Sequence, residues 1–208
     1  MSQANVSNST VIAAHDQILH FPKGGKPNLA PNEWLIWNGS QDEGGLPDLE
    51  HGKQNVLVPF AWWVQHHQES DIQSKTKAGH IGVWFAADDD ILKHAELIEE
   101  GKKVWPLVAA YFPIFRDGRS FSTAALLRDR FQWTGEVRAI GDVLIDQLLQ
   151  GARVGFDSFA LRPDQKTDVA LKQFDLFTVT TQNSWRDRRS QIRIQISGQL
   201  SNQPTEAL

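Results

Sequence analysis

The chain has 208 residues, of which 40% are hydrophobic and 22% are charged, and these values predict one folded domain. The formal net charge of −4 gives no basic face for a phosphate backbone, so we expect no nucleic-acid partner. Because the chain contains no cysteine, disulfides, thiolate nucleophiles and cysteine-ligated zinc or iron–sulfur sites are excluded.

Residues 1–54 are predicted to form an N-terminal extension of hairpin and loops. The start lacks the basic residues and apolar run of a signal peptide, and no apolar run is long enough to span a bilayer. We therefore expect a cytoplasmic protein with no membrane partner. Val11–Phe21 reads as a peripheral hairpin, and residues 22–31 and 39–52 as loops around the apolar patch Trp34–Trp37.

From residue 55 onward, short apolar runs alternate with stretches of helical periodicity, as in buried parallel strands and their crossover helices. Helices are expected at Ile91–Glu100, at Ser122–Phe131, and after an N-cap at Asp142. The predicted strands are Val56–Val58, Ile81–Phe85, Leu107–Phe112, Val137–Ile140 and Phe156–Leu161, with Phe177–Thr180 as a candidate sixth.

Five or six strand–helix units are fewer than the eight of a complete β/α barrel. We therefore predict an α/β fold with an open, mostly parallel sheet, and an incomplete barrel is the alternative. The α/β domain should cover residues 55–185, followed by a C-terminal tail at residues 186–208.

Polar residues after the predicted strand Leu107–Phe112 are the first ligand-binding candidates, because the crevice of a parallel sheet lies beyond the carboxyl ends of its strands. A helix N-terminus with nearby guanidinium groups suits sulfite, sulfate, phosphate or a carboxylate. The alternative is structural, with Asp117 capping the turn, a positive φ at Gly118, and Ser120 or Ser122 capping the helix. The candidates are Arg116, Asp117, Gly118, Arg119 and Ser122.

Arg138 lies within the apolar strand Val137–Ile140, where an unpaired charge is costly. Strand alternation places Glu136 on the same side, and Asp117 or Asp142 could approach from neighbouring strand ends. Two interpretations stay open. Either Glu136 and Arg138 form a buried structural ion pair, or Arg138 faces an anionic ligand.

The remaining motifs argue against a bound metal or cofactor. Asp88, Asp89 and Asp90 precede a predicted helix, where acidic residues are expected because they favour the helix dipole and cap the helix start. His66 and His67 are adjacent, so on a helix their side chains point in different directions and cannot easily share a metal. The sequence lacks the glycine-rich dinucleotide and phosphate-loop motifs, as well as the metalloprotease and serine-hydrolase motifs. We therefore predict no cofactor and no metal.

The stretch Phe112–Ser122, followed by Leu126–Arg130, Gly135–Leu144 and Asp146–Leu148, resembles one bacterial family. It is number nine-three-four of the domains of unknown function, often labelled "oxidoreductase probably involved in sulfite reduction". The motif positions that match are Asp117, Gly118, Arg119, Ser122, Arg128, Arg130, Glu136, Arg138, Gly141, Asp142, Asp146 and Gln147.

The chain departs from the family pattern in two places. Ser120–Phe121 stands where glycine–tyrosine is common, and Val154 where a cysteine often precedes Gly-Phe-Asp. Neither the tyrosine hydroxyl nor the thiol can therefore be essential here. The chain also lacks the cysteines that would hold the cluster of a catalytic sulfite reductase subunit.

The resemblance implies an accessory protein of assimilatory sulfite reduction, which binds sulfite reductase, another sulfur-assimilation protein or a small oxyanion through the loops after the third and fourth strands. If the protein binds an oxyanion, Arg119 and Arg138 are expected to contact the anion, and Asp117 and Glu136 are expected to orient the two arginines. The competing hypothesis is an enzyme acting on a small phosphorylated or carboxylated metabolite, with Asp142 or Asp117 as general base. A deep pocket around these residues would favour the enzyme, and arginines locked in ion pairs would favour the accessory protein.

Overall fold

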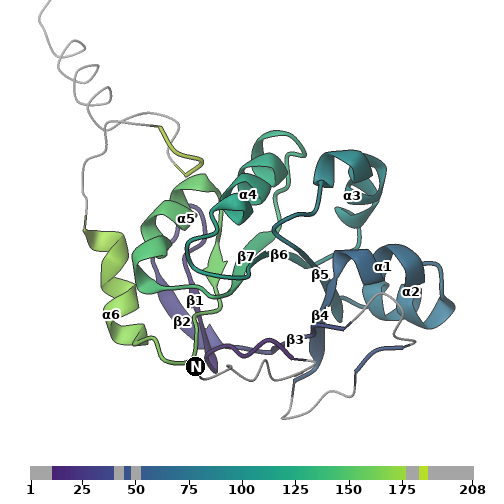
Figure 1. Cartoon of the computed structure of the whole chain (residues 1–208), viewed down its shortest axis with the longest axis horizontal. Coiled ribbons are helices and arrows are strands. Elements are labelled where there is room, and N and C mark those ends of the chain that lie inside the picture. Colours follow the sequence, from purple (N-terminus) through teal and green to yellow (C-terminus); the bar gives the residue numbers. More distant parts are fainter. Residues whose placement is uncertain (1–10, 40–44, 48–52, 177–182, 187–208) are drawn as a thin grey trace, which may run out of the picture.

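A computed structural model of the chain describes residues 11–39, 45–47, 53–176 and 183–186 (Figure 1). The described residues form an eight-stranded sheet in the order β2-β1-β8-β7-β6-β5-β4-β3. Neighbouring strands from β3 to β8 are parallel, whereas β1 runs antiparallel to both β8 and β2. The strands are β1 (Gln17–His20), β2 (Asn28–Pro31), β3 (Trp34–Ile36), β4 (Asn55–Pro59), β5 (Ile81–Phe85), β6 (Leu107–Phe112), β7 (Glu136–Gly141) and β8 (Ser158–Phe159).

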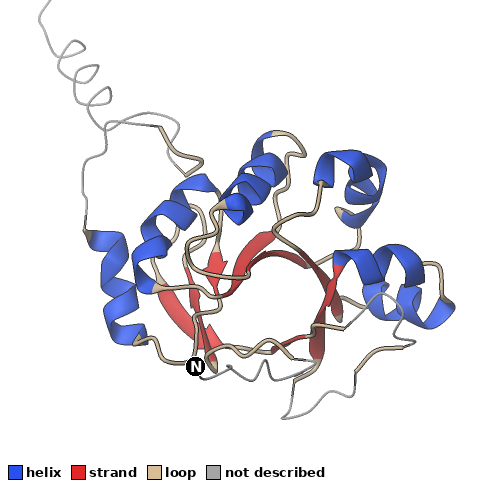
Figure 2. Ribbon diagram, in the orientation of Figure 1, coloured by secondary structure: helices blue, strands red, loops and turns tan. Residues whose placement is uncertain are grey.

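The helices lie outside the sheet, which curls so that its other face is turned inward (Figure 2). No helix among the described residues is long and apolar enough to cross a bilayer. The α-helices are α1 (Phe60–His66), α2 (Ser70–Lys77), α3 (Ala95–Gly101), α4 (Arg119–Asp129), α5 (Leu148–Val154) and α6 (Thr167–Leu171). Short 3-10 helices are η1 (Ile91–His94), η2 (Ile145–Gln147) and η3 (Lys172–Asp175).

The inner face of the curled sheet is filled by side chains from strands that face one another. Its buried members form a hydrophobic cluster separate from the larger one under the helices. A Cβ atom at Gly82 would lie 2.9 Å from the Leu57 side chain and 3.1 Å from the Trp34 ring, so glycine is required for this packing. The inner cluster consists of Ile18, Ile36, Leu57, Trp84, Leu107, Ala109, Ile140 and Ala160.

An extended segment at residues 11–16 links the two sides of the curled sheet. The amide of Ile12 donates to the carbonyl of Ile36 at 2.8 Å, and the amide of His15 donates to the carbonyl of Leu161 at 2.8 Å. The buried Asn32 holds the segment through a side-chain hydrogen bond of 3.3 Å to the carbonyl of His15. The architecture is therefore closer to the incomplete barrel than to the favoured open sheet.

The predicted fold class is confirmed, but the sheet has more strands than expected because residues 17–36 supply β1, β2 and β3. The predicted hairpin at Val11–Phe21 is wrong. Val11 pairs with Trp37, and β1 pairs with β2 and β8, because these partners cover edges of the sheet that a local hairpin would leave open. The candidate strand Phe177–Thr180 lies outside the described residues.

Candidate functional site

The predicted site residues fall into two groups at opposite ends of β7. Asp117 and Asp142 lie in loops beyond the carboxyl ends of β6 and β7, and Arg119 is the first residue of α4. Glu136 begins β7, and Arg138 lies near its start. The six residues of β7 extend about 20 Å. The predicted residues therefore do not surround one ligand.

Asp117, in the loop between β6 and α4, forms an ion pair with Arg119 at the start of α4. Asp117 accepts hydrogen bonds from the backbone amide of Arg119 at 3.1 Å and from its guanidinium Nη2 at 2.6 Å. Hydrogen bonds from Arg119 hold the pKa of the Asp117 carboxyl below its usual value. The Arg119 charge is therefore neutralised by a carboxylate two residues away.

The structural roles proposed for this loop are partly wrong. Gly118 has a φ of −84° and is itself the N-cap of α4, without a side-chain capping bond, so it does not supply a positive φ. The hydroxyl of Ser120 donates to the carbonyl of Tyr111 rather than capping the helix. Ser122 is exposed on the second turn of α4.

Asp142 connects three loops at this end of the sheet. It follows Gly141, which has a φ of 92° and whose added Cβ would lie 2.4 Å from the carbonyl oxygen of Phe112. One carboxylate oxygen of Asp142 accepts the amide of Phe115 at 2.8 Å, and the other accepts Nη1 of Arg162 at 2.7 Å. The predicted N-cap role is wrong, because η2 begins after Leu144. Both oxygens are already bonded, which fits loop organisation better than general-base catalysis.

Arg162 is shared by two carboxylates at the strand ends. Besides Asp142, it binds Asp164 through Nε at 2.6 Å and Nη2 at 2.9 Å. Hydrogen bonds from Arg162 lower the pKa of Asp164 to about 2. This guanidinium, like that of Arg119, is neutralised by protein carboxylates.

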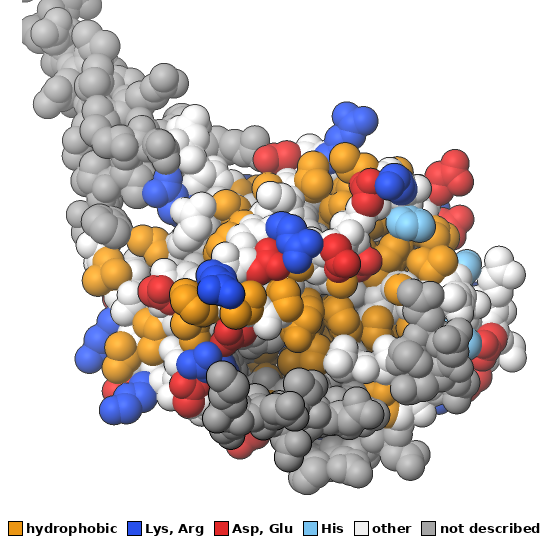
Figure 3. All heavy atoms as spheres, in the orientation of Figure 1, with side chains coloured by type: hydrophobic (Ala, Val, Ile, Leu, Met, Phe, Trp, Pro, Cys, Tyr) orange, Lys and Arg blue, Asp and Glu red, His pale blue; other side chains and the backbone are white. Residues whose placement is uncertain are grey.

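Two large apolar side chains and one cation remain outward-facing in the β6–α4 loop. Ile114 is 39% exposed and Phe115 is 47% exposed. Within the described part of the chain, the exposed Arg116 has no ion pair. Viewed from this side, acidic and basic side chains lie among hydrophobic ones over the middle of the molecule (Figure 3).

At the other end of β7, Arg138 is buried and paired. Its Nη2 donates to Glu136 at 2.7 Å, and its Nε donates to the hydroxyl of Ser158 at 3.1 Å. Burial alone would raise the pKa of Glu136, but Arg138 and Ser158 outweigh burial and lower it. The buried ion pair is the interpretation that the geometry supports. Asp117 and Asp142 bind other arginines.

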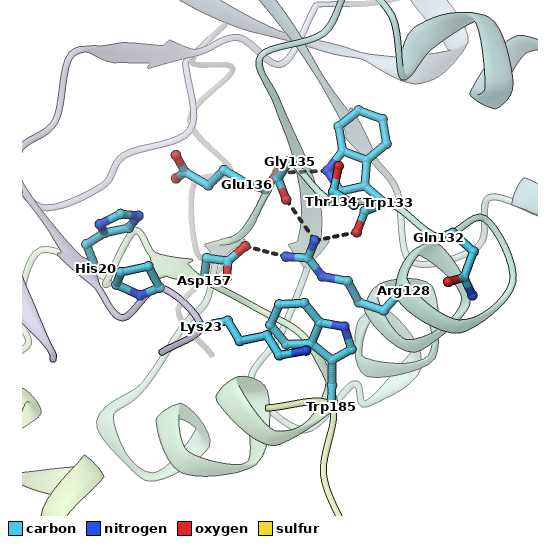
Figure 4. A pocket seen from close by; sticks show the side chains of 11 residues that line it. His20, Lys23, Arg128, Gln132, Trp133, Thr134, Gly135, Glu136, Asp157 and Trp185 are labelled. Atoms are coloured by element: carbon cyan, nitrogen blue, oxygen red, sulfur yellow. Dashed lines mark hydrogen bonds and ion pairs between the residues drawn. The ribbon is translucent and has the colours of Figure 1, made fainter. Parts of the chain in front are cut away.

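A second buried arginine lies beside a pocket of about 640 Å³ (Figure 4). The guanidinium of Arg128 donates to the backbone carbonyls of Gly155, Trp133 and Gly135 at 2.9, 2.7 and 2.8 Å. It also binds the Asp157 carboxylate. Burial raises the pKa of Asp157 and lowers that of Arg128, and the ion pair and hydrogen bonds between them offset this desolvation only in part.

The C-terminal segment at residues 183–186 covers this cluster. The ring of Trp185 lies over the Arg128 guanidinium, 4.1 Å from ring centroid to Cζ (Figure 4). Arg186 donates to the carbonyls of Ala152 at 3.0 Å and Phe156 at 2.7 Å, and burial lowers its pKa to about 10. The first residue of the predicted tail is thus bound to the domain, and residues 187–208 lie outside the described ranges.

The sequence interpretation missed this cluster. The helical periodicity of Ser122–Phe131 predicts a polar side that carries Arg128, Asp129 and Arg130, but the Arg128 side chain is fully buried. A signal was present in Asp157, an acid following the apolar Phe156 at the start of a predicted buried strand. No group of three histidine, aspartate or glutamate side chains placed to hold a metal occurs among the described residues.

These features define a curled, mostly parallel α/β protein with organised loops at the carboxyl ends of its strands. Residues 82–192 match the family described as "Bacterial protein of unknown function (DUF934)", and the chain belongs to that family. No curated protein matches the chain.

Proposed function

We propose that the chain is a cytoplasmic accessory protein of assimilatory sulfite reduction that acts by binding a protein partner, either sulfite reductase or another sulfur-assimilation protein. The pathway rests on the label that the family resemblance implies. The mode of action rests on the electrostatics of the strand-end loops.

The state of the arginines is the observation that carries this proposal. Arg119 is bound by Asp117, Arg162 by Asp142 and Asp164, and Arg138 by Glu136. At Arg119 and Arg162, a free oxyanion would have to displace carboxylates that belong to the same chain and are therefore present at high effective concentration. Binding through a protein surface requires no such displacement.

The alternative of an enzyme acting on a small anionic metabolite receives less support. Its candidate bases are Asp117 and Asp142, and each already accepts hydrogen bonds from an arginine and a backbone amide. A general base needs a free oxygen aimed at the substrate proton. In this loop arrangement both carboxylates act as organisers of the backbone.

The proposal is tested by measuring association of the purified chain with purified sulfite reductase, by calorimetry or biolayer interferometry. We expect a saturable complex with a dissociation constant of about 10 μM or tighter. A thermal-shift titration with sulfite, sulfate and phosphate should leave the melting temperature unchanged. No association with the reductase, together with a rise of several degrees in sulfite, would overturn the proposal in favour of an anion-binding protein.

A further inference from the structure

We infer that the β6–α4 loop is the docking surface for a partner protein, with Phe115 as its apolar anchor and Arg116 as its charged anchor. The partner surface that fits it is an apolar hollow bordered by carboxylates. The inference rests on the proposed function only for the identity of the partner.

The backbone of the loop is fixed on both sides of the Phe115 side chain. Its amide donates to Asp142 at 2.8 Å, and its carbonyl accepts a hydrogen bond from Nε2 of Gln147 at 2.5 Å. A turn follows in which the amide of Asp117 donates to the carbonyl of Ile114 at 2.9 Å. The loop is therefore held in one shape by residues of the β7–α5 connection.

A fixed backbone that points apolar side chains into solvent has no use in folding. Phe115 and Ile114 are among the most exposed large hydrophobic residues of the described chain. Large aromatic side chains and arginine are enriched at the centres of protein interfaces. Since the loop is ordered before it binds, little conformational entropy is lost on association.

The charge of the surface selects the kind of partner. Arg119 and Arg162 are neutralised by carboxylates of the chain, whereas Arg116, next to Phe115, has no ion pair among the described residues. An unpaired guanidinium beside an exposed aromatic ring is complementary to an acidic surface with an apolar depression. One exposed guanidinium without buried donors is a poor site for a free small anion.

The first experiment compares four variants of the full-length chain in binding to sulfite reductase. Phe115→Ala and Arg116→Glu should each weaken binding about tenfold or more, and Arg116→Glu should also reduce the dependence of the association rate on salt. The matched controls are Arg130→Glu, an exposed arginine at the other end of α4, and Leu176→Ala, an exposed leucine after η3. Both controls should bind within about twofold of wild type.

Three outcomes separate this inference from the proposed function. Loss of binding in Phe115→Ala and Arg116→Glu, with both controls normal, supports the surface. Wild-type affinity in both loop variants overturns the surface and leaves the proposed function standing. If sedimentation shows that the wild-type chain self-associates and that Phe115→Ala abolishes the self-association, the surface binds a second copy of the chain. That outcome overturns the assignment of the surface to a different protein.

If wild type does not bind the reductase, photo-cross-linking in a bacterium that encodes the chain tests whether the β6–α4 loop is a docking surface, independently of the proposed function. A photoreactive residue replaces Phe115 in one strain and Leu176 in another. A protein that cross-links from position 115 only, and whose purified form binds wild type but not Arg116→Glu, keeps the surface with a different partner. The absence of any adduct specific to position 115 overturns the surface as well.

Discussion

The two ends of β7 carry arginine–carboxylate pairs of the same chemistry in opposite surroundings. Near its start, the side chains of Arg128 and Arg138 are 0% and 7% exposed. Beyond its end, those of Arg119 and Arg162 are 59% and 42% exposed. A buried charge that loses its partner stays in a medium that solvates it poorly, whereas an exposed charge that loses its partner is solvated by water.

This contrast assigns different roles to the two ends of the sheet. The buried pairs join α4, β7, β8 and the segment at residues 183–186, so they stabilise the fold. The exposed pairs fix the loops at the carboxyl ends of the strands, where parallel α/β proteins place their functional groups. The same type of interaction thus maintains the fold at one end and presents a surface at the other.

Replacement of Arg128 should have the largest effect on stability. Arg128→Met removes the directly bonded arginine of the buried Asp157, leaving only the longer ion pair to Arg186 at 3.9 Å, and it leaves three carbonyl oxygens without their donor. These losses should lower the free energy of unfolding by about 4 kcal/mol. Urea denaturation measures this change. Arg130→Met, two residues along the same helix but exposed, is the control and should change stability by less than about 0.5 kcal/mol. Equal effects in the two variants would remove the distinction between the buried and exposed ends.

The turn that presents Asp142 should be the next most sensitive position. Gly141→Ala forces a Cβ atom toward the Phe112 carbonyl at a φ of 92°, and it should cost about 3 kcal/mol from strain and overpacking together. Gly118→Ala is the matched control, because its φ is −84° and its added Cβ would meet only the Phe121 ring at 3.8 Å. We expect this control to cost at most about 1 kcal/mol, from the poorer N-cap. Thermal and urea denaturation of both variants test the difference.

The Glu136–Arg138 pair should make part of the stability depend on pH. The folded-state pKa of Glu136 lies below the usual 4.5, so its contribution is complete above pH 4.5 and is lost as the pH falls through the folded value. Glu136→Gln leaves Arg138 buried without a counter-charge and should cost about 2 kcal/mol at pH 7. The difference between wild type and variant should shrink in acid, as followed by urea denaturation from pH 7 to pH 3. A difference independent of pH would show that Glu136 acts through packing alone.

Sequence patterns located the buried parallel strands well. Leu107–Phe112 and Ile81–Phe85 were predicted with their observed bounds, because both of their faces are covered and the runs are continuously apolar. β2 and β3 were missed as strands because they are four and three residues long and partly exposed, whereas the predicted hairpin overlapped β1 but gave it the wrong partner. Their pairing is set by distant partners, such as Leu19 with Phe159, which local periodicity does not report.

The candidate site was only partly accessible to sequence reasoning. Strand alternation was enough to pair Glu136 with Arg138, because both side chains point to the same face of β7. Whether Arg119 is free depends on the rotamer of Asp117 two residues earlier, and Arg128 is buried because its side of α4 faces the loop carbonyls of Trp133 and Gly155. These facts follow from tertiary contacts that a spacing rule does not contain.

The smallest expected effect distinguishes Arg116, in the β6–α4 loop, from Arg119 at the start of α4. Arg119→Ala removes an exposed pair and should change the free energy of unfolding by less than about 0.5 kcal/mol. It should also leave partner binding within about twofold of wild type, because Asp117 already neutralises this guanidinium, whereas Arg116→Glu acts on an unpaired charge. The affinities of both variants are measured in the same binding titration, and urea denaturation measures the stability of Arg119→Ala. If Arg119→Ala weakened binding as strongly as Arg116→Glu, the Asp117–Arg119 pair would have to open on association, and the docking surface would extend to the start of α4.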